Sequence, residues 1–432
     1  MGSSGYWPSP WPVECGGNHR QKAVPTLGLG LGPVDRLVAT TRHTGRWPVM
    51  FIQRSPGELY LQGTTLGHEP RVAGWVERVD PVTLEPLASS GDLPAGAHEW
   101  CGSIAAHRNG DLYTVNGSYL HRLTPTCSVV SELPLPVDHA HNGLLVLDDG
   151  SIITKDLRIG DAPSTLTVCD PDLAVLTTVE VPEPSMGRLA AVGDEIYVVG
   201  STRLFRYRWD GAALHRDVTW EPTYRHPDRG GLGWDTTIVD GWVWLMDNGD
   251  IPAVRTRFSQ SPTVRSAGDR GPTPPAADWD EPVRAIGISA ADDGNQLTII
   301  PTEHPAGWVI APPLVHGGVA VVWDTGGMGL AAFDLTGSRP GDMLWFQPFR
   351  PSMQPIVFPD TRELVINDFR LLDGTPSDDI VVLDLHTGQM KARVPTGSTR
   401  MNGMFLTPGF DRDLYYCSFD TVARIRAVSP EG

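Results

Sequence analysis

The chain has 432 residues, of which 51 are acidic and 34 are basic, and its formal net charge at pH 7 is −17. That charge would repel nucleic acid and anionic membranes, and no apolar run approaches the roughly 18 residues of a membrane-spanning helix, so we expect neither as a partner. The 47 glycines and 39 prolines favour many short strands joined by turns over a helical protein.

The N-terminal residues 1–34 are rich in Gly, Pro and Trp and show no strand pattern. We expect them to form an irregular arm on the outer surface of the domain. The glycines at 28, 30 and 32 follow no strand and open no helix, and the chain has no P-loop, so the sequence predicts no nucleotide cofactor. The five cysteines are odd in number and widely spaced, and the N-terminus lacks a signal-peptide pattern; both features favour a cytoplasmic protein.

One two-stranded unit recurs along the rest of the chain, and it is clearest in residues 141–156. Apolar residues 144–147 and 152–154 flank Asp149-Gly150, which predicts a β-hairpin with a type I′ turn, in which both central residues have positive φ. The second strand of the unit ends at residues 62, 116, 156, 200, 247, 324, 368 and 418. A β-rich period of roughly 40–50 residues is typical of propeller blades.

We therefore predict that residues 35–432 form a single all-β propeller of about eight four-stranded blades, with seven as the nearest alternative. The last unit supplies only three strands. A strand near residues 37–40 would complete it and close the ring, which removes the exposed edges of an open sheet. The long interval between Asp247 and Asp324 indicates a polar, Pro-rich insertion at residues 251–281, which is either a lid beside the site or a disordered segment.

In a propeller the innermost strand of each blade begins at the end of the channel where the second strand finishes. Such a channel mouth gathers side chains from many blades and is the usual place for a small-molecule site. The starts of the inner strands carry His98, Glu99, His139, His141, Asn142, Arg188, Asp235, Gln354 and Asn402, and the ends of the second strands carry Lys155, Asp247 and Asp324. A single aspartate at a strand end can be a simple turn former. Imidazole, guanidinium and carboxyl groups that recur at one end of the hairpins point instead to a site.

We predict a catalytic or metal-binding core of three histidines, His98, His139 and His141, supported by Glu99, Arg188 and Asp235. His139 and His141 are two residues apart and would project to the same side of an extended segment. Such a set can hold a divalent cation such as zinc or manganese. It can also act without a metal, with one His as general base and Arg188 or Lys155 stabilising an oxyanion.

Two segments resemble the start of the inner strand in gluconolactonase-like propellers: His141-Asn-Gly-Leu-Leu-Val-Leu-Asp-Asp-Gly and Met401-Asn-Gly-Met-Phe-Leu-Thr-Pro-Gly. The segment His98-Glu99-Trp100-Cys101-Gly102 is similar to the Glu-Gly segment of that family's first blade. The resemblance implies a propeller with a divalent cation such as calcium in its channel, and lactonase chemistry. It implies Glu99, Asn142 and Asn402 as cation ligands, with Asp247 or Asp324 as the acidic partner.

Two classes of function follow from these patterns. The first is an enzyme that acts on a small polar or cyclic substrate at the channel mouth, by hydrolysis, elimination or isomerisation. The second is a non-catalytic scaffold for protein–protein interaction, which would concentrate aromatic and Arg anchors on its rim. The charged and imidazole groups gather instead where the inner strands begin, which favours the enzyme. The chain has no GxSxG and no HExxH motif, so the common serine-hydrolase and zincin mechanisms have no support. The sequence does not indicate an oligomeric state.

Overall fold

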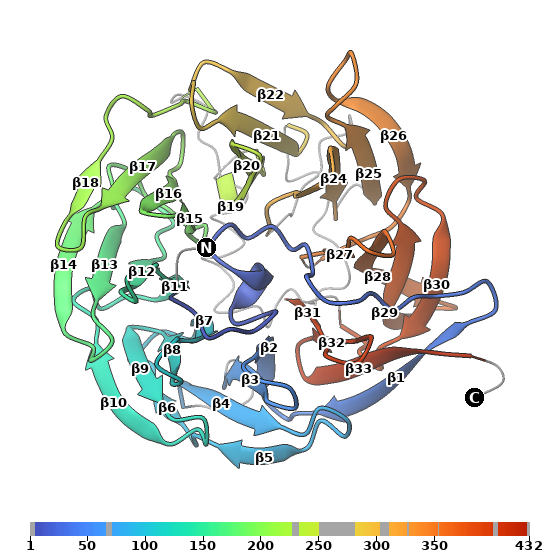
Figure 1. The fold of residues 1–432 in the computed structure, drawn as a ribbon, viewed down its shortest axis with the longest axis horizontal. Helices are drawn as coiled ribbons and strands as arrows, with labels where there is room; N and C mark the ends of the chain where they lie inside the picture. Colours follow the sequence, from blue (N-terminus) through green and yellow to red (C-terminus); the bar gives the residue numbers. More distant parts are fainter. Residues whose placement is uncertain are drawn as a thin grey trace.

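The computed structural model describes residues 5–65, 71–226, 233–249, 281–302, 311–325, 328–352, 354–400 and 405–429. In these residues the chain forms eight sheets that stand around a central channel as the blades of a propeller (Figure 1). The prediction of an all-β propeller of about eight blades is therefore confirmed. Among the described residues, the only helical element is the short 3-10 turn η1 (Glu14–Gly16), and no helix is long and apolar enough to cross a membrane.

Each blade contributes its first strand to the channel wall and its last strand to the rim. From the channel outward, the first three blades in chain order are β2 (Trp47–Gln53), β3 (Leu59–Thr64), β4 (Ala73–Val79) and β5 (Pro86–Ser89), with β6 (Leu93–Pro94) beside β4; then β7 (Cys101–Ala106), β8 (Leu112–Asn116), β9 (Tyr119–Leu123) and β10 (Val129–Pro134); then β11 (His141–Val146), β12 (Ile152–Asp156), β13 (Thr165–Cys169) and β14 (Val175–Glu180). The next three blades are β15 (Ala190–Val192), β16 (Glu195–Val199), β17 (Leu204–Trp209) and β18 (Leu214–Arg216); then β19 (Gly233–Val239), β20 (Trp242–Asp247), β21 (Arg284–Ser289) and β22 (Gln296–Ile299); then β23 (Leu314–His316), β24 (Val319–Asp324), β25 (Gly329–Asp334) and β26 (Asp342–Gln347). The last two blades are β27 (Ile356–Phe358), β28 (Glu363–Leu372), β29 (Thr375–Asp384) and β30 (Met390–Pro395); then β31 (Leu406–Pro408), β32 (Asp413–Cys417), β33 (Thr421–Val428) and β1 (Arg36–His43).

The ring closes through the N-terminal strand, as predicted. Strand β1 pairs with β33 in antiparallel register, from Arg36 opposite Val428 to His43 opposite Thr421. The last blade therefore combines strands from both ends of the chain, and β1 and β33 lie side by side in Figure 1. Closure pairs the edge that an open sheet would leave exposed.

The blades are apolar on both faces because each is packed between two neighbours. One buried cluster joins Leu145 and Ile153 of the β11–β14 blade to Ile196 and Phe205 of the β15–β18 blade. Another joins residues of the two blades that run from β23 to β30. A blade alone could not bury both of its faces, so the repeat folds only as a set.

The hairpin at residues 147–151 forms as predicted, but its turn is of another type. The N–H of Leu147 donates to the carbonyl of Ser151 at 2.8 Å, and the N–H of Gly150 donates to the carbonyl of Leu147 at 2.9 Å. Gly150 has a φ of +92°, whereas Asp149 is not among the residues with positive φ. The loop is a type I turn followed by a left-handed glycine. The type I′ prediction is wrong because three residues, not two, separate the paired positions.

The N-terminal arm lies in the channel, and the prediction that it covers the outer surface is wrong (Figure 1). The carbonyls of Trp11 and Asn18 accept the N–H groups of Gln53 (2.8 Å) and Ala191 (2.9 Å) on inner strands of two blades. Trp11 is 1% exposed. The inner strands carry unpaired backbone groups on their channel edges, and an irregular segment can satisfy groups on several blades at once.

The predicted insertion at residues 251–281 lies outside the described residues except for Glu281. Strands account for much of the remainder of the long interval between Asp247 and Asp324, of which residues 282–302 and 311–323 are described. Strands β21 and β22 complete one blade, and β23 begins the next.

Candidate functional site

The arm bends sharply at three residues whose side chains enter the channel. Cys15, Arg20 and Lys22 have φ values of 58°, 55° and 61°, in the left-handed region that residues with a Cβ seldom adopt. Such a conformation costs about 1–3 kcal/mol for each residue and persists where the surroundings impose it. All three side chains are buried. The strained backbone therefore serves to direct three reactive or charged groups to one place.

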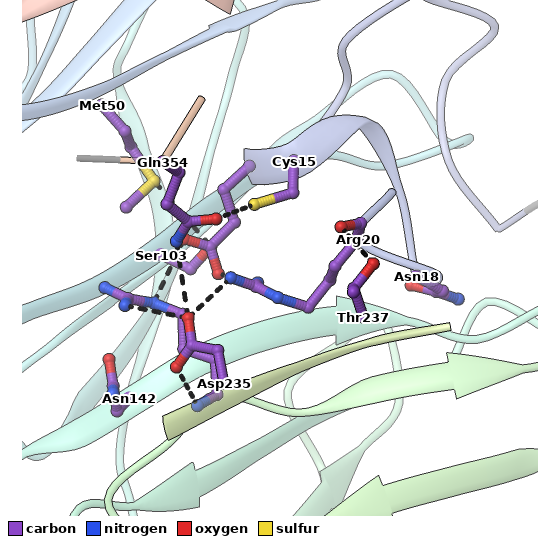
Figure 2. A network of polar contacts seen from close by, with 12 residues as sticks. Cys15, Asn18, Arg20, Met50, Ser103, Asn142, Asp235, Thr237 and Gln354 are labelled. Atoms are coloured by element: carbon purple, nitrogen blue, oxygen red, sulfur yellow. Dashed lines mark hydrogen bonds and ion pairs between the residues drawn. The ribbon is translucent and has the colours of Figure 1, made fainter. Parts of the chain in front are cut away.

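Four charged side chains form a buried network at the centre of the channel (Figure 2). Arg20 donates to Glu14 at 2.5 Å and to Asp235 at 2.8 Å. Arg188, which precedes β15, places Nε 3.1 Å from Oε2 of Glu14 and Nη1 3.6 Å from Oδ2 of Asp235. None of the four is more than 3% exposed. Two guanidiniums and two carboxylates balance one another, as buried charges must.

Neutral groups extend this network on the side of the arm (Figure 2). The Cys15 thiol donates to Oε1 of Gln354 at 2.6 Å, and Nε2 of Gln354 donates to Asp235 at 3.4 Å. Burial raises the pKa of the Cys15 thiol to about 11. Cys15 is therefore a protonated hydrogen-bond donor near pH 7 and not a thiolate nucleophile.

Two buried lysines flank the network, and both are held by backbone carbonyls. Lys22 donates from Nζ to the carbonyls of Pro312 (2.7 Å) and Pro313 (2.8 Å). Lys155 donates to the carbonyls of Ser185 (2.7 Å) and Asp156 (3.1 Å). Burial lowers the pKa of each lysine to about 7, although Asp235 favours the charged form of both. Each lysine can therefore give or take a proton near neutral pH.

β-Bulges at the starts of the inner strands turn polar side chains toward the channel. The pairing register shifts between Cys101 and Ser103, between His141 and Leu144, and between Gly233 and Thr236. Asn142 and Asp235 lie within two of these bulges, which re-aim side chains in this way. Gly143 has a φ of +82°, and a Cβ there would lie 3.1 Å from the side chain of Arg188. The glycine therefore permits both the bulge and the close approach of Arg188.

Aromatic rings cover the guanidinium of Arg188. Its Cζ atom lies 5.8 Å from the ring centroid of Trp100 and 5.1 Å from that of Phe405. The indole of Trp100 donates to Oδ1 of Asn142 at 3.1 Å, and Nδ2 of Asn142 donates to the carbonyl of Met186 at 2.8 Å. The ring contacts and the short polar chain hold Arg188 in one orientation.

Two histidines meet where β7 and β11 begin. The imidazoles of His98 and His139 stack with their centroids 5.3 Å apart, and Nε2 of His98 lies 3.1 Å from Oδ1 of Asp138. The side chain of His98 is 22% exposed and that of Asp138 is 84% exposed. Burial lowers the pKa of His139, and the nearby Arg158 lowers it further. The pKa of the Asp138 carboxyl is also lowered, through its hydrogen bonds with Ser118 and His98.

The imidazole of His141 has other contacts than those of His98 and His139. It is fully buried, and its Nδ1 atom lies 2.9 Å from the carbonyl of His139. Its Nε2 atom is buried with no hydrogen-bond partner among the described residues. Burial lowers the pKa of His141 to about 4. The imidazole is therefore neutral at pH 7.

Three of the residues expected to bind a cation have partners within the protein in the part of the chain that the structure describes. Asp247 pairs with Arg225 at 3.1 Å and with Arg284. Asp324 accepts a hydrogen bond from Thr302 at 3.1 Å. Glu99 is half-buried just before β7, Asn142 holds Trp100, and Asn402 lies outside the described residues. No group of three or more His, Cys, Asp or Glu side chains in the described ranges could hold a metal ion.

Sequence reasoning placed part of the site and missed the part that the arm supplies. The expected residues Arg188, Asp235 and Lys155 meet near the channel centre, and His98 meets His139. Glu14, Cys15, Arg20 and Lys22 were not expected, because the arm was assigned to the outer surface. Their one signal in the sequence is the presence of charged residues in a segment that is otherwise rich in Gly, Pro and Trp.

Comparison with known proteins defines the fold but not a family. No family model and no curated protein matches the chain. Sqt1 from Chaetomium thermophilum, solved with the N-terminus of a ribosomal protein bound, is 10% identical, with a TM-score of 0.58 over 89% of this chain and 98% of that one. The quinohemoprotein alcohol dehydrogenase ADHIIG from Pseudomonas putida is 12% identical, with a TM-score of 0.55 over 98% of this chain and 80% of that one.

A virginiamycin B lyase from Staphylococcus aureus is also similar, with 11% identity and a TM-score of 0.47 over 90% of this chain and 99% of that one. Likeness at such low identity shows the fold alone. The chain is a β-propeller. The two proteins with the higher TM-scores are one that is named as an enzyme and one that was solved with a protein segment bound, so they do not decide between the two classes of function.

Proposed function

We propose that this propeller is an enzyme that transfers protons on a small polar or cyclic substrate where β7 and β11 begin. The observation that carries the proposal is the group formed by His98, Asp138 and His139. An imidazole oriented by a carboxylate, with a second imidazole stacked beside it, is a suitable arrangement for general acid–base catalysis. Both histidines are only half-buried, so a substrate can reach them.

The roles follow from the hydrogen bonds. The lowered pKa of Asp138 favours its ionised form, which can accept only from the Nε2–H tautomer of His98; in that tautomer the lone pair of the ring lies on Nδ1. Nδ1 of His98 is then the proton acceptor. His139, kept neutral by its lowered pKa, relays or returns the proton. Arg188 and Lys155 stabilise negative charge that develops on a substrate oxygen. This chemistry serves elimination, isomerisation or hydrolysis, and no step is assigned to a metal.

Unpaired polar atoms support a function over a purely structural role. Nδ1 of His139 and Nε2 of His141 are buried without a hydrogen-bond partner among the described residues. A buried polar atom without a partner destabilises the fold, and a substrate that hydrogen-bonds to these two atoms would supply the missing partner.

The experiment is a search for isotope incorporation from solvent. The purified protein is incubated with a collection of small polar metabolites in D2O or in ¹⁸O-labelled water, and products are followed by mass spectrometry. Proton abstraction from carbon gives deuterium exchange, and hydrolysis gives ¹⁸O incorporation. We expect His98→Ala to lower the rate at least about 100-fold, which is the usual contribution of a general base.

The chain offers a matched control in His215 and Asp210, which form a second exposed His–Asp pair at 2.7 Å on the outer part of another blade. His215→Ala should leave the rate unchanged. Both variants should keep the unfolding midpoint of the parent, because both histidines are partly exposed. Equal rates in the two variants, or isotope incorporation that neither variant affects, would refute the proposal.

A protein-binding scaffold is the second candidate, and one surface favours it. The outer strand β26 exposes Met343 (51%), Leu344 (44%) and Phe346 (45%). Consecutive large apolar side chains on an exposed strand edge are typical of surfaces that pair with another chain. Replacing Met343 and Phe346 with Asp should then abolish capture of a partner and leave isotope incorporation intact.

A further inference from the structure

Basic side chains outnumber acidic ones at the channel centre once the lysines are counted. Arg20 and Arg188 are balanced by Glu14 and Asp235. Lys22 and Lys155 are not within ion-pair distance of any carboxylate in the described residues, and both are buried. The nearest acid along the chain, Asp156, is engaged with Arg158 at 2.5 Å.

This cation excess is unusual in its setting. The whole chain carries a formal net charge of −17, and Lys22, Lys155 and Lys391 are its only lysines. Two of the three lysines are therefore buried beside two arginines at the centre of a strongly acidic protein. Burial disfavours the protonated form of each lysine, and an anionic ligand beside it would stabilise that form.

The spare hydrogen-bond donors lie beside the same charges. Nη2 of Arg188 is buried and has no partner among the described residues. The ammonium of Lys155 has three protons and uses two of them, on the carbonyls of Ser185 and Asp156. Lys155 donates to the carbonyl of Ser185, three residues before Arg188, and Arg188 adds to the effect of burial in lowering the pKa of Lys155, so the two basic groups lie close enough to repel each other.

We propose that the substrate is a small organic carboxylate, bound between Arg188 and Lys155. The inference rests on the proposed function, which it deepens by naming the substrate class. A carboxylate accepts up to four hydrogen bonds and fits the planar guanidinium with two oxygens. The rings of Trp100 and Phe405 fix the plane of Arg188, and the negative charge offsets one of the two unpaired lysines. The ligand therefore stabilises the protonated form of Lys155 beside the guanidinium of Arg188.

The small number of lysines makes a direct test possible. Protein labelled with ¹³Cε-lysine should give three lysine NMR signals, which are assigned with Lys22→Met, Lys155→Met and Lys391→Met. Each signal is titrated between pH 5.5 and 9 in the presence of sodium acetate, sodium succinate, inorganic phosphate or acetamide, which is the neutral control. We expect carboxylate to raise the pKa of Lys155 by about one unit, equivalent to tenfold tighter binding to its protonated form. The signal of Lys391, which is exposed in part, should not respond.

Three variants separate this proposal from the proposed function. Lys155→Met removes an unpaired buried cation with a side chain of similar length, so it should fold and lose carboxylate binding at least tenfold. His98→Ala should retain carboxylate binding while it loses catalysis. Lys391→Met should bind as the parent does.

A carboxylate effect that is absent, that acetamide reproduces, or that persists in Lys155→Met would overturn the substrate class. A response to phosphate alone would overturn it as well. Carboxylate binding without any isotope incorporation would refute only the enzymatic function.

Discussion

Asp235 is the residue whose replacement tests the buried network most directly. It accepts hydrogen bonds from Arg20 (2.8 Å), from the backbone N–H of Arg188 (2.7 Å) and from Gln354 (3.4 Å), and it is 0% exposed. Asp235→Ala leaves two buried guanidiniums with Glu14 as their one carboxylate partner. Removing one partner of a buried ion pair costs about 3–5 kcal/mol. With an m-value of about 3 kcal/mol/M, the urea midpoint should fall by about 1–1.7 M.

A matched exposed pair provides the control. Arg208 and Asp194 lie 2.6 Å apart, a distance as short as the one between Arg20 and Asp235, but their side chains are 72% and 47% exposed. Asp194→Ala should give no measurable shift of the midpoint, because water solvates the arginine that remains. Unfolding is followed by tryptophan fluorescence in urea, which does not screen charges.

Restoring the charge balance should restore stability. Adding Arg20→Met to Asp235→Ala removes one charge of each sign, so the double variant should be more stable than Asp235→Ala alone. The reasoning fails if Asp235→Ala unfolds at the same urea concentration as Asp194→Ala. It fails equally if the double variant shows the summed loss of the two single variants.

Three further predictions concern closure, pH and metal. Deleting β1 should abolish cooperative unfolding, measured by urea titration, because β33 then loses its partner from Arg36 to His43; a cooperative transition in the deleted protein would contradict ring closure. Burial raises the pKa of Asp378 to about 7, so the folded state holds a proton that the unfolded chain releases near pH 4. Its contribution to stability is therefore greatest below about pH 4 and is lost as the pH rises toward 7. The urea midpoint of the parent should fall relative to that of Asp378→Asn over that interval. A chelator should leave isotope incorporation unchanged, because Asp247 is engaged with Arg225 and Arg284; loss of activity that added calcium restores would reinstate the cation ligands that the sequence suggested.

The propeller itself could be predicted because its signals are local. Asp149-Gly150 and its counterparts mark hairpins, since a turn depends on the conformations of a few adjacent residues. The blade count followed from the spacing of the second strands. The closure followed from the missing strand of the last unit, because a closed ring needs a partner for β33.

The histidines at the channel mouth could be predicted only in part. Their position at the starts of β7 and β11 follows from the hairpin pattern. The directions of their side chains do not, because bulges shift the alternation of side chains by one residue. His139 stacks on His98, while His141, two residues away, is fully buried; His98 and His139 precede their strands, where no regular alternation fixes the direction of a side chain.

What the sequence by itself determined is the architecture: all-β, about eight blades, and closed by its first strand. Only the tertiary structure decided the contents of the channel. Arg20 meets Asp235 across 215 positions of sequence, and Cys15 meets Gln354 across 339. No local pattern encodes such pairings. The free energy of a buried charge depends on which groups the fold places around it, and those groups come from blades far apart in the sequence.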